Sequence, residues 1–173
     1  PATALTAPGG PIRLPPTEEA ARITAEAELG LVIGRTCTDV DEGAFGEVVA
    51  GVVPVIDVTA EDVLRRNPRF LTRAKSYDTF LVVGPVIAVP DGSADLADAT
   101  VTTRVNGEVA AANEVRNMLF SPAEVVSFHS EVATLAPGDL FSTGTPGAAA
   151  IEPGDEVRAT VESIGSVSAP VTR

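Results

Sequence analysis

The apolar residues of this chain come in short runs that glycine and proline interrupt. The two longest are VVAGVVPVI at 48–56 and LVVGPVIAVP at 81–90, and the chain holds 15 Gly and 14 Pro. Both runs fall short of the roughly 18 apolar residues that a membrane-spanning helix needs. Such interruption favours many short elements joined by tight turns. We therefore predict a mixed, β-rich (α+β) fold, a β-roll or sandwich with a few short helices, and not a doubly wound sheet.

Length and charge narrow the class of protein further. The 173 residues suit a single domain, which we place at 23–173 behind an extended lead-in at 1–22 that we expect to continue an upstream segment. Acids outnumber bases 24 to 12, for a net charge of −12, which argues against nucleic acid or an anionic membrane as a partner. Cys37 is the sole cysteine, which excludes an internal disulfide or a thiolate cluster and suits a reducing cytoplasm.

Strands are predicted where β-branched residues cluster. We expect strands at about 23–33, at 52–58 with Pro54 at a bulge or edge, and at 78–89, interrupted at Gly84-Pro85. The clearest local signal is a β-hairpin at 100–111, which turns on Asn106-Gly107.

Helices are predicted from their capping residues. The clearest lies at 121–132, with Ser121 as N-cap and Glu124 three residues on. We also expect a short helix at 42–50, capped by Asp41 and ended by Gly51, and one at 59–66 with Thr59 as N-cap. Residues 67–70 are expected to form a loop.

Two carboxylates begin an otherwise apolar predicted strand, Glu26 and Glu28 in AEAELGLVIGR. Residues two apart in a strand point to the same face, so these like charges need water, a base or a cation between them. Asp57, at the end of VVPVI, and Lys75, in RAKSYDTF, are further polar interruptions of apolar strands. Three carboxylates plus waters suit a hard cation such as Mg²⁺, Mn²⁺ or Ca²⁺. The alternative is a solvated strand face with Asp57 capping the next turn, and spacing alone favours it.

Other polar positions carry weaker signals. The loop STGTPG at 142–147 presents backbone N–H groups and hydroxyls that can hold an anion, although a simple turn explains it equally well. His129 is the sole histidine, and we expect a structural or surface role for it, because a catalytic triad needs partners that the sequence does not show. Cys37 is interpreted as incidental.

Taken together, these segments resemble the fumarylacetoacetate hydrolase family, specifically its C-terminal catalytic domain. The resemblance runs from about residue 8 to the end of the chain. It rests on seven motifs in the family's order: AEAELGLVIGR (25–35), GVVPVIDVTAED (51–62), AKSYDTFLVVGP (74–85), VNGEV (105–109), NMLFSPAEVV (117–126), TLAPGDLFSTGTPG (134–147) and EPGD (152–155).

The resemblance implies roles for five residues. It implies that Glu26, Glu28 and Asp57 bind a divalent cation, usually Mg²⁺ or Mn²⁺. It also implies that Lys75 and Thr145 contact the substrate, with Lys75 adding positive charge where negative charge develops. A β-roll or sandwich of the family's type and a homodimer are implied as well.

The reaction implied is less specific than the site. A small 2-oxo or enol (di)carboxylic acid would be the partner, and the expected change is C–C cleavage, by hydrolysis or decarboxylation, through an enolate that the metal stabilises. The first alternative is an isomerase of 2-hydroxy-diene dicarboxylates in aromatic catabolism. An alternative of another class is a non-catalytic binding or scaffold homologue.

Two departures from the family pattern bear on the substrate. Where the family commonly reads D-x-S/T-A-R-D-x-Q, this chain has Glu61 for the arginine and Leu64 for the glutamine. Fumarylacetoacetate itself is therefore not the expected substrate. Hydrolytic members use a histidine with a nearby glutamate from an N-terminal segment, and residues 1–24 hold no histidine.

Overall fold

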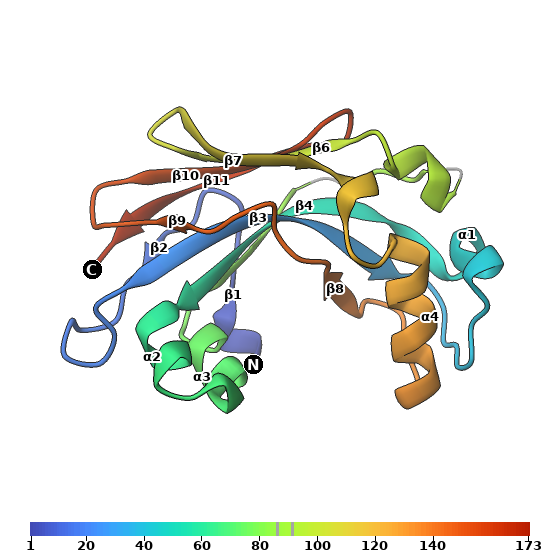
Figure 1. Ribbon diagram of the computed structural model, residues 1–173, viewed down its shortest axis with the longest axis horizontal. Helices are drawn as coiled ribbons and strands as arrows, with labels where there is room; N and C mark the ends of the chain where they lie inside the picture. Colours follow the sequence, from blue (N-terminus) through green and yellow to red (C-terminus); the bar gives the residue numbers. More distant parts are fainter. Residues whose placement is uncertain (86, 91) are drawn as a thin grey trace.

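Two β-sheets packed face to face form the centre of the protein, with the α-helices outside them (Figure 1). The computed structural model describes residues 1–85, 87–90 and 92–173. The first sheet has the order β1 (Leu5–Thr6), β5 (Leu81–Val83), β4 (Val49–Ala60), β3 (Ile23–Ile33), β8 (Leu140–Ser142), with β9 (Ala149–Ala150) also pairing with β3. The second has the order β2 (Ile12–Arg13), β11 (Gly165–Thr172), β10 (Glu156–Val161), β6 (Thr100–Val105), β7 (Glu108–Glu114). This confirms the predicted β-rich sandwich.

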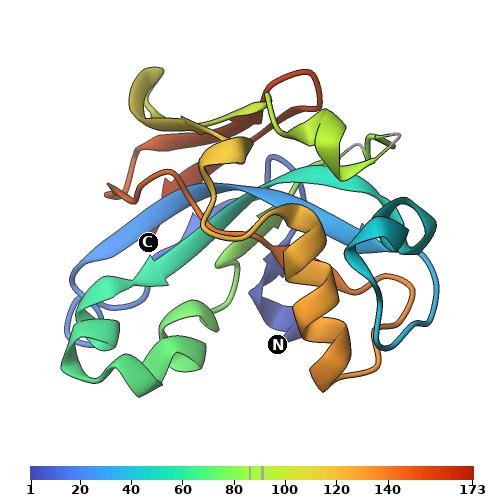
Figure 2. The same ribbon diagram turned by 45° about the vertical axis from the view of Figure 1, so that its right-hand side comes forward.

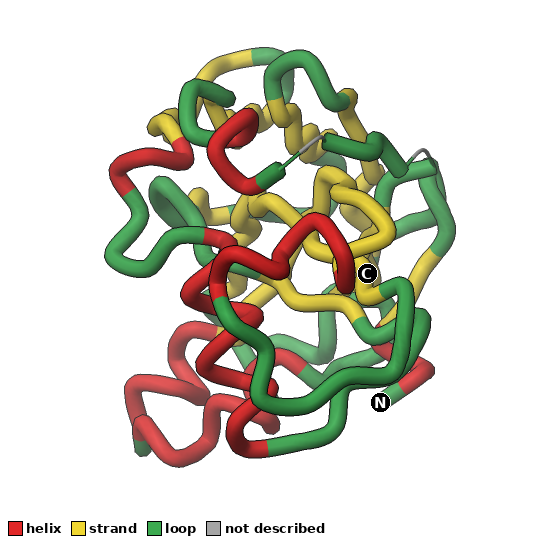
Figure 3. The backbone as a smooth tube through the Cα atoms, turned by 90° about the vertical axis from the view of Figure 1, so that its right-hand side faces the viewer, coloured by secondary structure: helices red, strands yellow, loops and turns green. Residues whose placement is uncertain are grey.

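The α-helices are short and lie on the far side of the β3–β4 sheet from the second sheet (Figures 1 and 2). They are α1 (Phe45–Val48), α2 (Glu61–Arg66), α3 (Leu71–Lys75) and α4 (Pro122–Val132). The 3₁₀ turns are Ala2–Ala4, Glu42–Ala44, Pro68–Phe70, Ser93–Leu96 and Val115–Asn117. Figure 3 shows the loops of the chain in green, and α1 and α2 adjoin β4 with no loop between them. Within the described residues, no helix has both the length and the apolar character to cross a membrane.

The antiparallel pair β3–β4 lies at the centre of the structure. One face of this pair packs into the core between the sheets, where Leu29, Leu31, Ile56 and Val58 are fully buried. Cross-strand partners share a face, and Glu26 lies opposite Asp57 in the register. The other face therefore collects the acids of both strands.

Two local predictions are confirmed. The hairpin β6–β7 turns on Asn106 and Gly107, whose φ angles of 52° and 86° are the left-handed conformation that this turn needs. Helix α4 begins with the predicted capping box, in which Ser121 accepts from the Glu124 amide and the Glu124 carboxylate accepts from the Ser121 amide.

The helix predicted at 42–50 is wrong in extent. A 3₁₀ turn and the four-residue α1 end at Val48, Asp41 makes no side-chain cap, and β4 begins at Val49. Gly51 lies inside β4 and does not end a helix. The backbone at Ala88 passes so close that only a residue without a side chain fits there. A Cβ on Gly51 would meet the Ala88 carbonyl oxygen at 2.6 Å.

The segment 59–75 also differs from the prediction. Thr59 is a strand residue and not an N-cap, since α2 begins at Glu61. The stretch predicted as a loop is a 3₁₀ turn capped by Asn67, and α3 follows it. Lys75 accordingly ends a helix and does not interrupt a strand.

Pro54 occupies the interior of β4 without breaking the sheet. It lies opposite Leu29 in the register, and its carbonyl accepts from the Gly84 amide at 2.9 Å, one residue beyond the end of β5. Its missing N–H thus falls where β5 has ended. The predicted bulge or edge position is wrong, because β4 lies between β3 and β5 and its register shift with β3 is at Val32 and Ile33. Of the predicted strand 78–89, β5 and a bridge between Val52 and Ala88 are present, and Val86 lies outside the described residues.

Candidate metal centre

Three carboxylates converge on one face of β3–β4. Glu26 and Glu28 come from β3 and Asp57 from β4, and one carboxylate oxygen from each lies within 4.8 Å of the others. Glu28 is only 3% exposed and Asp57 8%, while Glu26 is partly buried. These acids are therefore not on a solvated strand face, and Asp57 does not cap the turn before α2, because it lies three residues inside β4.

Lys75 reaches into the cluster from the end of α3. Its Nζ lies 2.5 Å from Oδ2 of Asp57, 3.1 Å from Oε2 of Glu26 and 2.8 Å from Oγ1 of Thr59. An ammonium has three N–H donors, so each of them has one acceptor. The structure thus places Lys75 beside two of the acids that the family resemblance implied for the same site.

The loop 142–147 holds Glu28 from the other side. Oε2 of Glu28 accepts hydrogen bonds from the Ser142 hydroxyl and from the Gly144 amide, the latter at 2.9 Å. Both flanking strands, β8 and β9, pair with β3, so the loop between them passes along the edge of β3 beside Glu28. The anion that this loop binds in the structure is therefore a side chain of the same protein.

Burial and mutual repulsion shape the electrostatics of the cluster. Desolvation, followed by repulsion from Asp57, raises the pKa of Glu28 above its usual range. Desolvation also raises the pKa of Asp57, and this outweighs the opposing attraction of Lys75. Although desolvation lowers the pKa of Lys75, attraction and hydrogen bonding to Asp57 and Glu26 raise it overall. Lys75 therefore remains an ammonium.

The donor set fits a divalent cation. Within the described part of the chain, Lys75 is the one cation at ion-pair distance from any of these carboxylates, and it pairs with Glu26 and Asp57. When all three acids are ionised, one positive charge leaves a double negative charge uncompensated in a largely buried place. A hard divalent ion bound by carboxylate oxygens would supply that charge.

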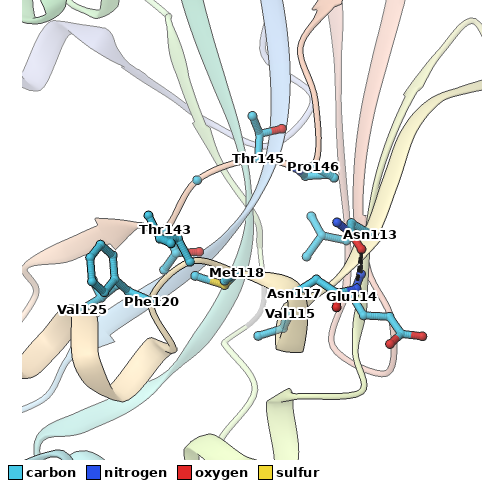
Figure 4. Close-up of a pocket in the computed structure, with 13 residues that line it drawn as sticks. Asn113, Glu114, Val115, Asn117, Met118, Phe120, Val125, Thr143, Thr145 and Pro146 are labelled. Carbon is cyan, nitrogen blue, oxygen red and sulfur yellow. Dashed lines mark hydrogen bonds between the residues drawn. The ribbon is translucent and has the colours of Figure 1, made fainter.

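Thr145 belongs to the loop beside Glu28 but does not touch the cluster. Among the described residues its hydroxyl hydrogen-bonds only within its own turn, donating to the Gly147 carbonyl at 3.1 Å and accepting from the Gly147 amide at 3.2 Å. It also lines a cavity of about 290 Å³, shared with Asn113 and Phe120 (Figure 4). No hydrogen bond in the described structure joins Thr145 to the acids or to Lys75.

The remaining polar positions lie elsewhere. His129 is exposed on α4, with Nδ1 2.8 Å from the Val125 carbonyl oxygen and its ring against Phe141, which agrees with a surface role. Glu61 pairs with Arg22 and Arg65, whereas Leu64 packs on the hydrophobic core.

The sequence did not predict the contacts that three residues make at the site. Thr59 contacts Lys75, and Ser142 and Gly144 hold Glu28. For the last two, the signal is the Ser/Thr-rich loop, which the sequence showed could hold an anion but which a simple turn explained equally well. For Thr59, the alternation of β4 places it on the face of Asp57, and an N-cap assignment hid this.

Comparison with known proteins agrees with the fold and the site. The family described as fumarylacetoacetate (FAA) hydrolase C-terminal matches residues 1–172. The chain is 40% identical to Protein Rv2993c of Mycobacterium tuberculosis over 100% of its own length and spans 64% of that protein.

The solved structures that are similar to the chain include an isomerase and a hydrolase. The first is 5-carboxymethyl-2-hydroxymuconate delta-isomerase from Mycobacterium smegmatis, with a TM-score of 0.93 and 40% identity, covering 100% of this chain and 67% of that one. The second is maleylpyruvate hydrolase from Sphingobium sp. SYK-6 in complex with manganese(II) and pyruvate, with a TM-score of 0.88 and 30% identity, covering 99% and 62%. These findings define a class of proteins that share a two-sheet, β-rich fold and a carboxylate centre. The chain belongs to the fumarylacetoacetate hydrolase family.

Proposed function

We propose that this chain is the catalytic part of a divalent-metal-dependent enzyme that acts on a small 2-oxo or enol (di)carboxylic acid. Glu26, Glu28 and Asp57 would be the metal ligands. The observation that carries the proposal is the convergence of these three acids, two of them nearly fully buried, with a single lysine to balance them. Mg²⁺ and Mn²⁺ are the proposed ions, and the manganese complex of the maleylpyruvate hydrolase supports this choice.

Each residue of the site has a definable task. When bound, a divalent cation supplies Lewis-acid stabilisation of negative charge that develops on a 2-oxo group. Lys75 remains an ammonium and adds a second positive charge at the same place. Ser142 and Gly144 orient the Glu28 carboxylate. We assign Thr145, in the same loop, a contact with the substrate.

The proposed reaction is C–C bond cleavage, by hydrolysis or decarboxylation. A 2-oxo product matches the pyruvate found with the maleylpyruvate hydrolase. The second candidate is isomerisation of a 2-hydroxy-diene dicarboxylate, which the name of the M. smegmatis structure favours at 40% identity. Both reactions use an enolate, so the same carboxylates and lysine serve either. A homodimer and a cytoplasmic location complete the proposal.

A calorimetric titration of chelator-treated protein with Mn²⁺ tests the metal centre. We expect one site per chain, which Glu28→Ala abolishes and Glu18→Ala leaves intact, because Glu18 is an exposed acid outside the cluster. Equal binding by all three proteins, or none by the unmodified chain, would overturn the assignment.

Asp57→Ala separates an enzyme from a binding or scaffold homologue. In an enzyme the variant loses metal-dependent turnover of 2-oxo acids by at least about a hundredfold, the scale of losing a charge-stabilising group at the reacting centre. In a scaffold, assembly and stability stay unchanged or improve as repulsion within the cluster falls.

A further inference from the structure

The hydroxyl of Thr59 contacts both Lys75 and one of the acids, Glu26. Thr59 is 4% exposed and precedes the last residue of β4. Its Oγ1 accepts from Lys75 Nζ at 2.8 Å and lies 3.4 Å from Oε2 of Glu26, to which it donates. A hydroxyl that donates in one direction presents its lone pairs in the other, so the bond to Glu26 aims Thr59 at Lys75.

The three acceptors of Lys75 are not equivalent. Two of them, on Asp57 and Glu26, are carboxylates of the donor set that fits a cation. The third, on Thr59, is a neutral hydroxyl outside that set. A divalent cation held by the acids would compete with the ammonium for carboxylate oxygens and would repel it by Coulomb's law. Thr59 is then the one of the three Lys75 acceptors for which the cation does not compete.

We propose that Thr59 is a positioning residue that keeps the Lys75 ammonium beside the acid cluster when a divalent cation occupies the carboxylates. This inference rests on the proposed function, since it needs a metal-binding cluster. It assigns Thr59 no contact with substrate. The role of Thr59 is to let Lys75 and the cation occupy the same site in spite of their like charges.

Removing the hydroxyl should therefore weaken metal binding through Lys75. In Thr59→Val the side chain keeps its branched shape, but an ammonium displaced from the carboxylates has no remaining acceptor among its three. It competes with the ion more strongly, and we expect the Kd for Mn²⁺ to rise about tenfold, the scale of one lost hydrogen bond to a charged group. Thr59→Ser retains the hydroxyl and should bind within about twofold of the unmodified chain.

Combination with Lys75→Met isolates the effect. In the Lys75→Met background there is no ammonium to hold, so Thr59→Val should leave the Kd for Mn²⁺ unchanged, and the two substitutions are then non-additive. Thr24→Val is the matched control. Thr24 is a buried threonine opposite Thr59 in the register, and no hydrogen bond in the described structure joins its side chain to the cluster.

The measurement is calorimetric titration with Mn²⁺ of chelator-treated full chains whose circular dichroism matches that of the unmodified protein. Thr59→Ala carries the same expectation and replaces Thr59→Val if the latter does not fold. A tenfold rise that serine restores and Lys75→Met cancels supports the proposal. Unchanged binding in Thr59→Val, or an equal rise in the Lys75→Met background, overturns it while leaving the metal centre intact. Absence of binding by the unmodified chain overturns the metal centre, and this inference with it.

Discussion

The hydroxyl of Thr103 in the second sheet accepts a hydrogen bond from the backbone amide of Ala27 in the first, at 2.9 Å. Ala27 lies between the two glutamates of the cluster. At the edge of β3 away from β4, strand β9 pairs only with residues 24–25 and β8 only with residues 30–32. The Ala27 amide therefore has no strand partner at that edge. A fully buried threonine from the opposite sheet satisfies it instead. The backbone that carries the acids is thereby bonded to both sheets.

Thr103→Val should destabilise the protein by about 1–3 kcal/mol, because the buried Ala27 amide would lose its acceptor while side-chain shape is kept. Chemical denaturation measures this as a fall in the free energy of unfolding. Thr103→Ser keeps the hydroxyl and should lose less than Thr103→Val. Equal stability of the valine and serine variants would show that the bond contributes nothing.

Ser142→Ala should destabilise the protein by about 1–3 kcal/mol at a pH above the raised pKa of Glu28, where the Ser142 hydroxyl donates to an ionised carboxylate. The loss should shrink toward pH 4, because a protonated Glu28 gains little from an added donor. Denaturation at the two pH values checks this. Ser166→Ala, at an exposed position of β11, should be neutral at both, and a pH-independent loss in Ser142→Ala would contradict the assignment.

The stability of the metal-free protein should fall as pH rises through the titration of the cluster. The folded-state pKa of Glu28 is raised above its ordinary value of 4.5, so folding favours the protonated form. Its contribution to stability is complete below 4.5 and is lost as pH rises through the raised folded pKa. Each tenfold gain in proton affinity on folding corresponds to about 1.4 kcal/mol of this contribution. The raised pKa of Asp57 acts in the same direction.

Glu28→Gln should remove the Glu28 share of this fall, since glutamine stays neutral. The measurement is the free energy of unfolding from pH 4 to pH 8 for both proteins, without metal and with Mn²⁺. Saturating Mn²⁺ should offset the fall in the unmodified chain only, by binding the folded form. Identical pH profiles for the two metal-free proteins would refute the prediction.

Gly30→Ala should destabilise the protein by about 1–3 kcal/mol through overpacking beside the cluster. Gly30 shares the face of Glu28, and a Cβ there would meet Val55 Cγ2 at 2.8 Å and Val53 Cγ1 at 2.9 Å. Gly43→Ala is the control, because no atom lies within 4 Å of its added Cβ. Thermal unfolding should show a lower Tm for the first variant and an unchanged or higher Tm for the second.

Local sequence was sufficient for several elements. The Asn106-Gly107 turn and the Ser121–Glu124 capping box involve residues at most three apart, so neighbouring residues alone determine them. The strand at 23–33 was predicted with its observed bounds, and the two-residue alternation placed Glu26 and Glu28 on one face. The helix predicted at 59–66 is present as α2, although it begins at Glu61. The extent of α1 and the presence of α3 were not predicted, because such short segments depend on contacts with the core more than on caps.

The sequence by itself thus determined that two acids share a face of a strand, and the family motifs indicated which further residues to consider. Only the tertiary structure decided what these acids meet. Asp57 faces Glu26 through the register of β3 and β4, Lys75 arrives from a helix 49 residues away, and Ser142 reaches Glu28 across 114 residues. Such pairings depend on how the core packs, because side-chain alternation fixes a face of the sheet but not the partner across it.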